Sequence, residues 1–590
     1  MGFQRIEHTV DLCVVGGGLS GLCAAVAAAR HGLKVALMHD RPMLGGNASS
    51  EIRMWVCGAQ GENNRETGLL EEMMMENQYR NPDKNYYIWD GILYGLAKKE
   101  KNITLLLNCS CLDASMKDGL IDTVTGWQTT TQKYHRVKAG LFADCSGDSI
   151  LAPLTGASFR EGREARKEFG ESIQPIQADA YTMGMSCMFQ AEETGEPQAF
   201  IPPDWAEQIT EEQLVHRKAD LSSPLENFWY LELGGMRDTI GDTEEIRDEL
   251  LPLAYGIWDY LKNSPQEREK SRNWRLTWMG ALPGKRESRR YEGAYIMNQN
   301  DVQSGGNFPD EVAYGGWTMD DHHPAGFRTS EKPTIHHSVE PPYGIPYRCL
   351  YSQDVPNLYF AGRNISVSHA ALSSCRVMGT CAMLGQAVGT AAYIAVTQRC
   401  LPKEISESHI AYLQDLLMDD DCYLPHFQRQ VSRLCEKAVL EGEGYGLECL
   451  RDGTDRDRAG EAHAWSGEIG NKIAYVFETP CHISRIRLVF DSDLNRQTLP
   501  WPENSMNRNM FHNRLLSCVP SRMPATMLKR YRVTAYGPDG SRTVVVEEEN
   551  NYLRLRKYDV DISDCSRLVF EPLETWGSEE VRIFGFEAVE

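Results

Sequence analysis

The N-terminal part of the chain places short apolar runs on either side of a glycine-rich turn. Residues 10–15 are mostly apolar, residues 16–21 form the turn, and residues 22–31 are an alanine-rich helical stretch. Gly32 ends that stretch, and residues 34–39 form a second apolar run. Because strand-length runs flank a helical one, the pattern predicts a β-α-β unit with parallel strands.

Two later strands also run directly into glycine. Residues 141–145 lead into Ser146-Gly147-Asp148, and residues 358–362 precede a long alanine- and glycine-rich helix over residues 379–396. Strands that end at glycine turns are typical of the ligand-binding edge of a parallel α/β sheet. We therefore predict one nucleotide-binding domain built from two separated parts of the chain, residues 8–155 and 346–440.

The stretches between and after these parts have different patterns. Residues 156–345 mix charged helical stretches, such as 243–261, with aromatic-rich strands, such as 228–233. After a polar linker, residues 451–590 hold short apolar runs separated by turns, without helical stretches between them. The sequence thus predicts a Rossmann-type α/β domain with an inserted α+β substrate domain, followed by an all-β sandwich.

Composition and charge narrow the function classes. The 590 residues carry 61 Lys and Arg against 83 Asp and Glu, a formal net charge of 61 − 83 = −22. Such a chain has no bulk attraction for nucleic acid or anionic lipid, and no apolar run approaches the ~18 residues of a membrane span. The 17 cysteines show no paired CxxC spacing, and no export signal precedes the first strand. We expect a cytoplasmic protein with no metal, no membrane contact and no nucleic-acid partner.

The glycine turn has the GxGxxG spacing of a dinucleotide-binding site. Gly16 allows a tight turn, Gly18 lets a pyrophosphate approach the backbone, and Gly21 lets helix and strand pack closely. Leu19 and Ser20 complete the turn, where the helix N-terminus offers N–H groups and the positive end of its dipole. The alternative is a glycine-rich turn without a ligand.

The position that usually holds a ribose-binding acid, at the end of the second strand, is occupied by His39. Asp40 follows one residue later. Either the carboxylate of Asp40 or the neutral imidazole of His39 can reach a ribose hydroxyl, so both are candidates.

Three further segments favour FAD over NAD, a choice that the glycine turn leaves open. Residues 41–47 resemble the loop by which FAD-dependent oxidoreductases of the glutathione-reductase-like class continue toward the flavin. Residues 143–148 and 357–363 resemble the middle and late strand-turn elements of that class. The resemblance implies FAD as cofactor and adds these cofactor-binding residues: Arg41, Gly45, Gly46, Asn47, Ser146, Gly147, Asp148, Gly362 and Arg363.

More narrowly, the chain is similar to the FAD-dependent oxidoreductase family, which is distantly like fumarate reductase flavoproteins. The similarity covers roughly residues 8–430 and is carried by residues 45–51, 65–68, 284–290, 346–348 and 374–389. It implies redox chemistry on a small-molecule substrate but defines neither that substrate nor the electron acceptor. The N-terminus of the 379–396 helix suits the flavin pyrimidine end, so Met378, Gly379 and Thr380 are predicted there.

A flavin enzyme also needs a group that moves a proton, and histidines are the leading candidates. His369 lies just past Gly362, on a loop expected to pass the flavin, and ranks first; His323, in a turn-rich loop, ranks second. Each histidine could instead make only a structural hydrogen bond. Arginines that are candidate clamps for an anion or hydroxyl, or else partners in salt bridges, are Arg286, Arg289, Arg290, Arg348 and Arg376.

The C-terminal residues from about 450 onward resemble a discoidin-like or galactose-binding-like jelly roll. The similarity is carried by the runs 473–477, 483–490 and 575–586. Such modules often bind sugars; the alternative is that this one covers the active-site mouth or forms a homo-oligomer interface. Trp501, Asn507 and Tyr552 are candidates for either role.

Three functions follow from these features. The first is FAD-dependent dehydrogenation of a small polar, carbohydrate-like substrate by hydride transfer to flavin N5, with a histidine as base. The second is reduction of an activated C=C bond, with arginines clamping a carboxylate, as the fumarate reductase likeness suggests. The third is a sugar- or partner-binding protein whose flavin is only structural.

Overall fold

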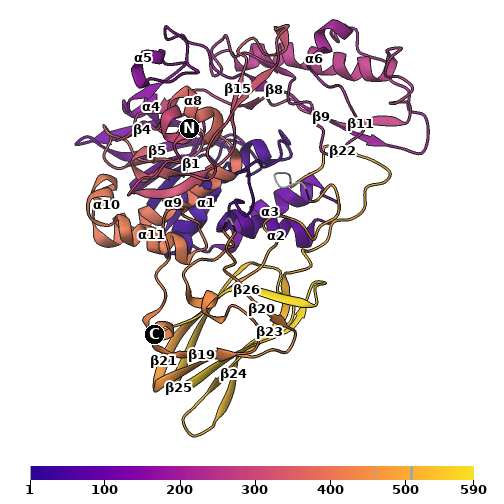
Figure 1. Cartoon of the computed structure of the whole chain (residues 1–590). Coiled ribbons are helices and arrows are strands. Elements are labelled where there is room, and N and C mark those ends of the chain that lie inside the picture. The colour runs from indigo at the N-terminus through magenta and orange to yellow at the C-terminus, as the bar shows by residue number, and fades with distance from the viewer. Residues whose placement is uncertain (1, 459, 505–508) are drawn as a thin grey trace. The chain divides into compact units, whose positions relative to one another are not determined.

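The computed structural model describes residues 2–458, 460–504 and 509–590 (Figure 1). The chain divides into two compact units. Unit 1 comprises residues 1–59, 83–413 and 507–520, and unit 2 comprises residues 60–82, 414–506 and 521–590. Each unit therefore contains a short segment that lies far along the chain from the rest of it.

Unit 1 is built on a parallel sheet that ends at the glycine turns. The predicted strands at residues 10–15, 34–39, 141–145 and 358–362 are confirmed. An antiparallel extension continues the sheet beyond β6. The parallel strands, in pairing order, are β3 (Ile103–Leu106), β2 (Val35–Met38), β1 (Arg5–Val15), β6 (Lys133–Asp144) and β18 (Leu358–Phe360), and the extension is β5 (Leu120–Gln128) and β4 (Cys109–Lys117).

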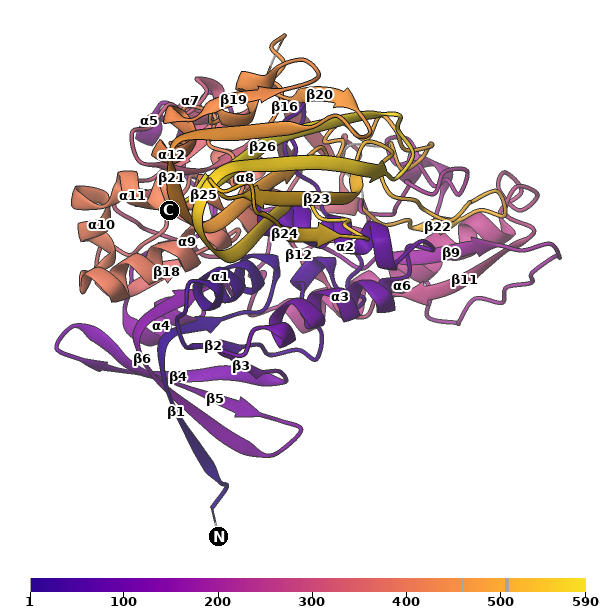
Figure 2. The same cartoon turned by 90° about the horizontal axis from the view of Figure 1, so that it is seen from below.

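Two helices, α1 (Leu19–Arg30) and α9 (Met378–Gln398), pack against each other (Figures 1 and 2). A Cβ on Gly385 of α9 would lie 1.9 Å from the backbone oxygen of Ser20. Glycine is therefore required where the two helices come closest. Among the described helices only α9 is long and apolar enough to cross a membrane, yet 89% of its most apolar window is buried, as in a core helix.

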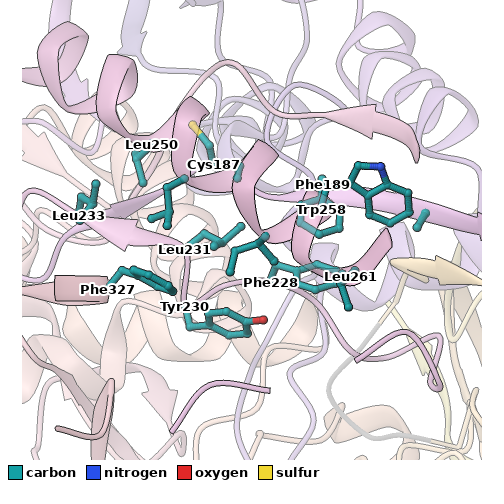
Figure 3. Close-up of a cluster of buried hydrophobic side chains, with 14 of the residues drawn as sticks. Cys187, Phe189, Phe228, Tyr230, Leu231, Leu233, Leu250, Trp258, Leu261 and Phe327 are labelled. Carbon is teal, nitrogen blue, oxygen red and sulfur yellow. The ribbon is translucent and has the colours of Figure 1, made fainter. Parts of the chain in front are cut away.

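The middle of the chain packs around α6 (Thr243–Asn263), which confirms the helix predicted over residues 243–261. Leu250, Trp258 and Leu261 of α6 join Phe189 and Phe228 in a buried cluster (Figure 3). Burial of these side chains removes a large apolar area from water, which stabilises the fold of this region. The strand predicted over residues 228–233 is wrong except at Glu232–Leu233, because its first residues form a turn that buries Phe228.

Short elements complete unit 1, and β22, from the segment 507–520, lies beside β9 (Figure 1). The paired strands are β7 (Phe159–Arg160) with β13 (Arg290–Tyr291), β8 (Met185–Ser186) between β10 (Glu232–Leu233) and β12 (Gly284–Lys285), β9 (Phe189–Glu193) between β11 (Trp274–Met279) and β22 (Asn513–Arg514), β14 (Glu311–Gly315) with β17 (Tyr343–Pro346), and β15 (Met319–His322) with β16 (Thr334–His337). The remaining helices are α3 (Tyr86–Lys99), α4 (Leu151–Thr155), α5 (Arg166–Phe169), α7 (Gln299–Gln303), α8 (His369–Cys375), α10 (Pro402–Ser408) and α11 (Ile410–Asp419), whose last residues belong to unit 2.

Unit 2 is an antiparallel β region, as predicted from residues 451–590, but it includes an unpredicted earlier segment. The predicted runs 473–477 and 483–490 form one long strand, β21 (Ile473–Phe490). The strands in order are β20 (Trp465–Glu468), β26 (Glu580–Val589), β21, β25 (Leu555–Thr575), β23 (Leu528–Tyr536) and β24 (Arg542–Glu548), with β19 (Val439–Gly442) on β21. Helix α12 (Arg433–Lys437) and helix α2 (Leu69–Arg80) belong to the same unit, although α2 lies far upstream in the sequence.

Candidate functional site

A cavity of about 450 Å³ in unit 1 lies where the glycine-ended strands converge. Nearly all of the predicted cofactor residues line it, although they come from six separated segments. They are Gly16, Gly18, Leu19, Ser20, His39, Asp40, Arg41, Gly45, Gly46, Asn47, Ser146, Gly147, Asp148, Gly362, Arg363 and Met378, joined by the predicted arginine Arg376. Gly21, Gly379, Thr380, His369, His323 and Arg286 do not line the cavity.

The glycine turn has the geometry that a pyrophosphate needs. A Cβ on Gly16 would lie 2.4 Å from the backbone of Cys145, and one on Gly21 would lie 1.8 Å from Gly16 O. A Cβ on Gly18 would meet nothing closer than Gly46, 4.0 Å away, because that side of Gly18 faces the cavity. Helix α1 begins there without a side-chain cap, so its dipole and first N–H groups are directed toward the cavity.

His39 holds the turn in place rather than facing a ribose. The N–H of Gly17 donates to His39 Nδ1 at 3.0 Å, and His39 Nε2 donates to the carbonyl of Met43 at 2.9 Å. Burial lowers the pKa of His39 to about 4, so the ring is neutral and both nitrogens are in use. Of the two ribose candidates, Asp40, which is largely exposed at the cavity wall, keeps a carboxylate that can accept from a ribose hydroxyl.

The charge of the cavity wall suits a diphosphate. It carries more cationic than acidic side chains, so its net charge is positive. Burial alone would raise the pKa of Asp148, but the charges of Arg363 (2.6 Å) and Lys285 (2.8 Å) lower it and keep the carboxylate ionised. The cations are Arg41, Lys285, Arg289, Arg363 and Arg376, and the acids are Asp40 and Asp148.

Two features of the chain bear on the flavin contact predicted at the start of helix α9. Among the described residues, Arg376 Nε is buried without a hydrogen-bond partner, while its Nη2 donates to Asp320. Helix α9 begins beside it at Met378, also without a side-chain cap. The N–H of Gly379, predicted to contact the flavin, is already bonded to Cys57 O at 2.8 Å, and of the three residues predicted there only Met378 lines the cavity.

His369 is fixed between two carboxylates on the substrate-domain side. Its Nδ1 lies 2.9 Å from Glu287 Oε2, and its Nε2 lies 3.2 Å from Asp321 Oδ1. Burial would lower the pKa of His369, but the charge of Glu287 and the bond to Asp321 raise it to about 10. The ring is therefore a protonated donor at neutral pH, and the predicted role of a free base does not match this state.

His322, not His323, forms a second cluster in which a buried histidine lies between two carboxylates. Its Nδ1 lies 2.6 Å from Glu232 Oε2 and its Nε2 lies 3.0 Å from Asp320 Oδ2. Burial lowers the pKa of His322, and the charges of Glu232 and Asp320 outweigh that effect and raise it. Asp320 also accepts from Arg376 at 3.1 Å, which links the His322 cluster to the cavity wall.

His323 belongs to neither of these two histidine–carboxylate clusters. Its side chain is about one-third exposed, and its Nδ1 accepts from the N–H of Ala325 at 3.1 Å. The segment expected to be a turn-rich loop contains strand β15, in which alternate side chains face opposite ways. Asp320 and His322 therefore share one face of β15, and Asp321, on the other face, contacts His369. Predicting residues 319–322 as a strand would have placed Asp320 and His322 on the same face.

Other cavity and network residues were missed because they adjoin the site only in the folded chain. Cys109, Ser110 and Cys111 of β4 line the cavity, and Lys285 lines it beside Asp148. Glu287 lies in the loop between β12 and β13, and Glu232 lies in β10. Only alternation along a strand could have indicated Cys109 and Cys111, and no local pattern indicates the two glutamates.

Comparison with known families agrees with the cavity. The family described as FAD dependent oxidoreductase matches residues 11–417, and the chain belongs to this family. FAD is accordingly its cofactor, and the residues that line the cavity fit it. No curated protein matches the chain.

Solved structures show looser likenesses. A geranylgeranyl bacteriochlorophyll reductase-like protein from Thermoplasma acidophilum is 13% identical over 70% of this chain and 84% of its own, with a TM-score of 0.32. The family 32 carbohydrate-binding module of Streptococcus pneumoniae EndoD is 11% identical over 27% of this chain and 98% of its own, with a TM-score of 0.19. The corresponding module of C. perfringens NanJ, solved with galactose, is 11% identical over 27% and 97%, also with a TM-score of 0.19. Scores this low support no functional argument.

Proposed function

We propose that this FAD-dependent oxidoreductase dehydrogenates a small, neutral, hydroxylated substrate of carbohydrate-like polarity. The observation that carries the proposal is the electrostatic balance beside the cavity. Glu287, Asp321, Glu232 and Asp320 surround two histidines and neighbouring arginines, so the region offers matched donors and acceptors rather than an excess of positive charge. Hydroxyl groups both donate and accept, and Asp321 and Asp320, with side chains 22% and 14% exposed, are the carboxylates that such a group can reach.

The arginines expected to clamp a carboxylate are already paired with acids. A guanidinium that is committed to an internal carboxylate has little net charge left for a substrate anion. This pairing argues against a dicarboxylate substrate. The pairs are Arg286–Glu232 (3.4 Å), Arg289–Glu161 (3.2 Å), Arg290–Glu164 (2.9 Å), Arg348–Asp310 (2.9 Å) and Arg376–Asp320 (3.1 Å).

FAD, when bound, supplies the acceptor for the hydride that leaves the substrate C–H bond. The chain must take the proton of the substrate hydroxyl. Asp321 is the accessible member of the His369 cluster, with 22% of its side chain exposed against 3% for His369. In this proposal Asp321 accepts the proton, and the imidazolium of His369, itself held by Glu287, orients that carboxylate.

Reduction of an activated double bond is the second candidate, and one observation favours it. A histidine whose pKa is raised to about 10 is a proton donor at neutral pH, as protonation of a substrate carbon requires. In that reaction His369 would donate its Nε2 proton, through Asp321, to the substrate carbon that does not receive the hydride.

The two candidates are separated by following flavin absorbance near ~450 nm without oxygen. A panel of polyols and sugars should bleach the oxidised protein, whereas enoates should fail to reoxidise the dithionite-reduced protein. Asp321→Asn should slow bleaching by about 100-fold or more with FAD still bound, while the exposed control Glu331→Gln should not. Reoxidation by enoates without bleaching by any hydroxylated compound would overturn the dehydrogenase proposal.

A further inference from the structure

Residues 60–82 lie in the family-matched part of the sequence but fold with the C-terminal β region. They leave unit 1 after Ala59 and return to it at Asp83. Between these points they form a loop and helix α2, whose buried residues include acidic as well as apolar side chains. A helix buried on several sides cannot be stable without the elements that cover it.

The strongest contact is an ion pair inside unit 2. Arg496 Nη2 lies 3.0 and 3.1 Å from the two carboxylate oxygens of Glu71, and the two side chains are only 6% and 1% exposed. Arg496 Nη1 donates to the carbonyls of Ser492 and Asp493 in the same loop. Burial would raise the pKa of Glu71, but two cations lower it: Arg496 has the larger effect, and Arg65 of the upstream segment the smaller one. Because a buried carboxylate that loses its main ion-pair partner is unfavourable, Glu71 depends on the C-terminal part of the chain.

The loop before α2 is held through its backbone. Arg456 donates to the carbonyls of Asn63 (2.8 Å) and Arg65 (3.0 Å) and to Thr67 Oγ1 (2.9 Å). Arg456 also lies 4.0 Å over the ring of Tyr423. One arginine from the C-terminal part thus satisfies three acceptors of the upstream loop, a contact specific to its conformation.

The far end of α2 occupies an aromatic surface of the β region. Tyr79 stacks on Tyr552 with ring centroids 4.1 Å apart and meets Trp576 edge-on at 5.9 Å. The hydroxyl of Tyr552 accepts from Arg80 at 2.7 Å, and Asn550 Nδ2 donates to the hydroxyl of Tyr79 at 2.7 Å. The face of Tyr552 that could have stacked on a sugar is therefore covered. Trp501 is 60% exposed, and Asn507 lies outside the described residues.

We infer that the surface of the β region around Arg456, Arg496 and Tyr552 is a docking site for residues 60–82 of the same chain, not a carbohydrate site. The β region acts as a clamp on a segment of the cofactor-binding sequence. The inference is independent of which substrate the enzyme oxidises.

Hydrogen exchange of the full-length, FAD-loaded protein tests this directly. Glu71→Gln should speed exchange at least about tenfold in both Leu69–Arg80 and Leu528–Tyr536, and leave Leu19–Arg30 of unit 1 unchanged. Arg496→Lys, which keeps the charge, should give the same pattern with a smaller change. Glu62→Gln, at an exposed position of the same segment, is the matched control.

Two results would overturn the inference. One is faster exchange in Leu69–Arg80 alone, or in Leu69–Arg80 together with Leu19–Arg30, while Leu528–Tyr536 stays protected. The other is saturable binding of galactose or a related monosaccharide to the wild type that Tyr552→Ala abolishes. No binding of sugars, together with coupled exchange of α2 and β23, supports the clamp.

Discussion

Replacing His369 with glutamine tests whether a buried imidazolium stabilises unit 1. The pKa of His369 is raised from 6.5 to about 10 by the two carboxylates that outweigh its burial. At about 1.4 kcal/mol per pKa unit, the shift corresponds to a stabilisation on the order of 4–5 kcal/mol, taken as an upper estimate. Because the folded pKa lies above the unfolded one, this stabilisation is complete below pH 6.5 and disappears as the pH rises through about 10.

The expected result is a difference in pH dependence. The wild type should lose stability between pH 6.5 and 10, whereas His369→Gln should be less stable by about 3–5 kcal/mol near neutral pH and nearly insensitive over that range. His369→Gln/Asp321→Asn should recover part of the loss, because it removes one of the two carboxylates that lose their contact with the imidazolium. Urea unfolding of the FAD-loaded protein at pH 6.5, 8, 9 and 10, followed by release of flavin fluorescence, measures these differences.

Parallel stability profiles for the wild type and His369→Gln from pH 6.5 to 10 would refute the reasoning. They would mean that His369 binds no extra proton in the folded state and that its carboxylate partners do not control it. A direct measurement of the His369 titration by NMR would then place its pKa near the ordinary value.

Further substitutions test the cavity. Gly18→Ala should keep the fold but weaken FAD binding by about tenfold or more, because its Cβ enters the cavity. Gly21→Ala should prevent folding, since its Cβ would lie 1.8 Å from Gly16 O. Flavin fluorescence titration measures the first effect, and circular dichroism measures the second. Asp148→Asn should raise FAD affinity in low salt, since it adds net positive charge to the wall, and equal affinity would contradict that account. His322→Gln should slow flavin reduction without releasing FAD, by freeing Asp320 to draw Arg376 away; a rate like that of His323→Gln would exclude this role.

The cofactor-binding part could be predicted well because its signals are local. Strand-length apolar runs that end at Gly16, Gly147 and Gly362 specify turns that only glycine adopts easily, with φ values of 104°, 77° and 114°. The parallel sheet then brings those turns to one edge whatever the intervening chain does. Most predicted cofactor residues therefore lie on one cavity.

The partners of the buried histidines could not be predicted equally well because they are distant in sequence. His369 and Glu287 are separated by 82 positions, and His322 and Glu232 by 90. Choosing between His322 and His323 requires knowing that β15 is a strand and which face is buried, and a shift of one residue exchanges the two. Likewise, nothing in residues 60–82 indicates that Glu71 needs an arginine from the C-terminal region.

The pairing of Glu71 with Arg496 also affects how the chain is made. The two residues are 425 positions apart, and at about 5–20 residues per second a ribosome needs roughly 20 to 85 s to travel between them. During that interval α2 has emerged without the residues that cover its carboxylate. The N-terminal sheet can begin to form before residues 60–82 have the C-terminal contacts that bury Glu71. We therefore expect chaperone contact with residues 60–82 early in synthesis.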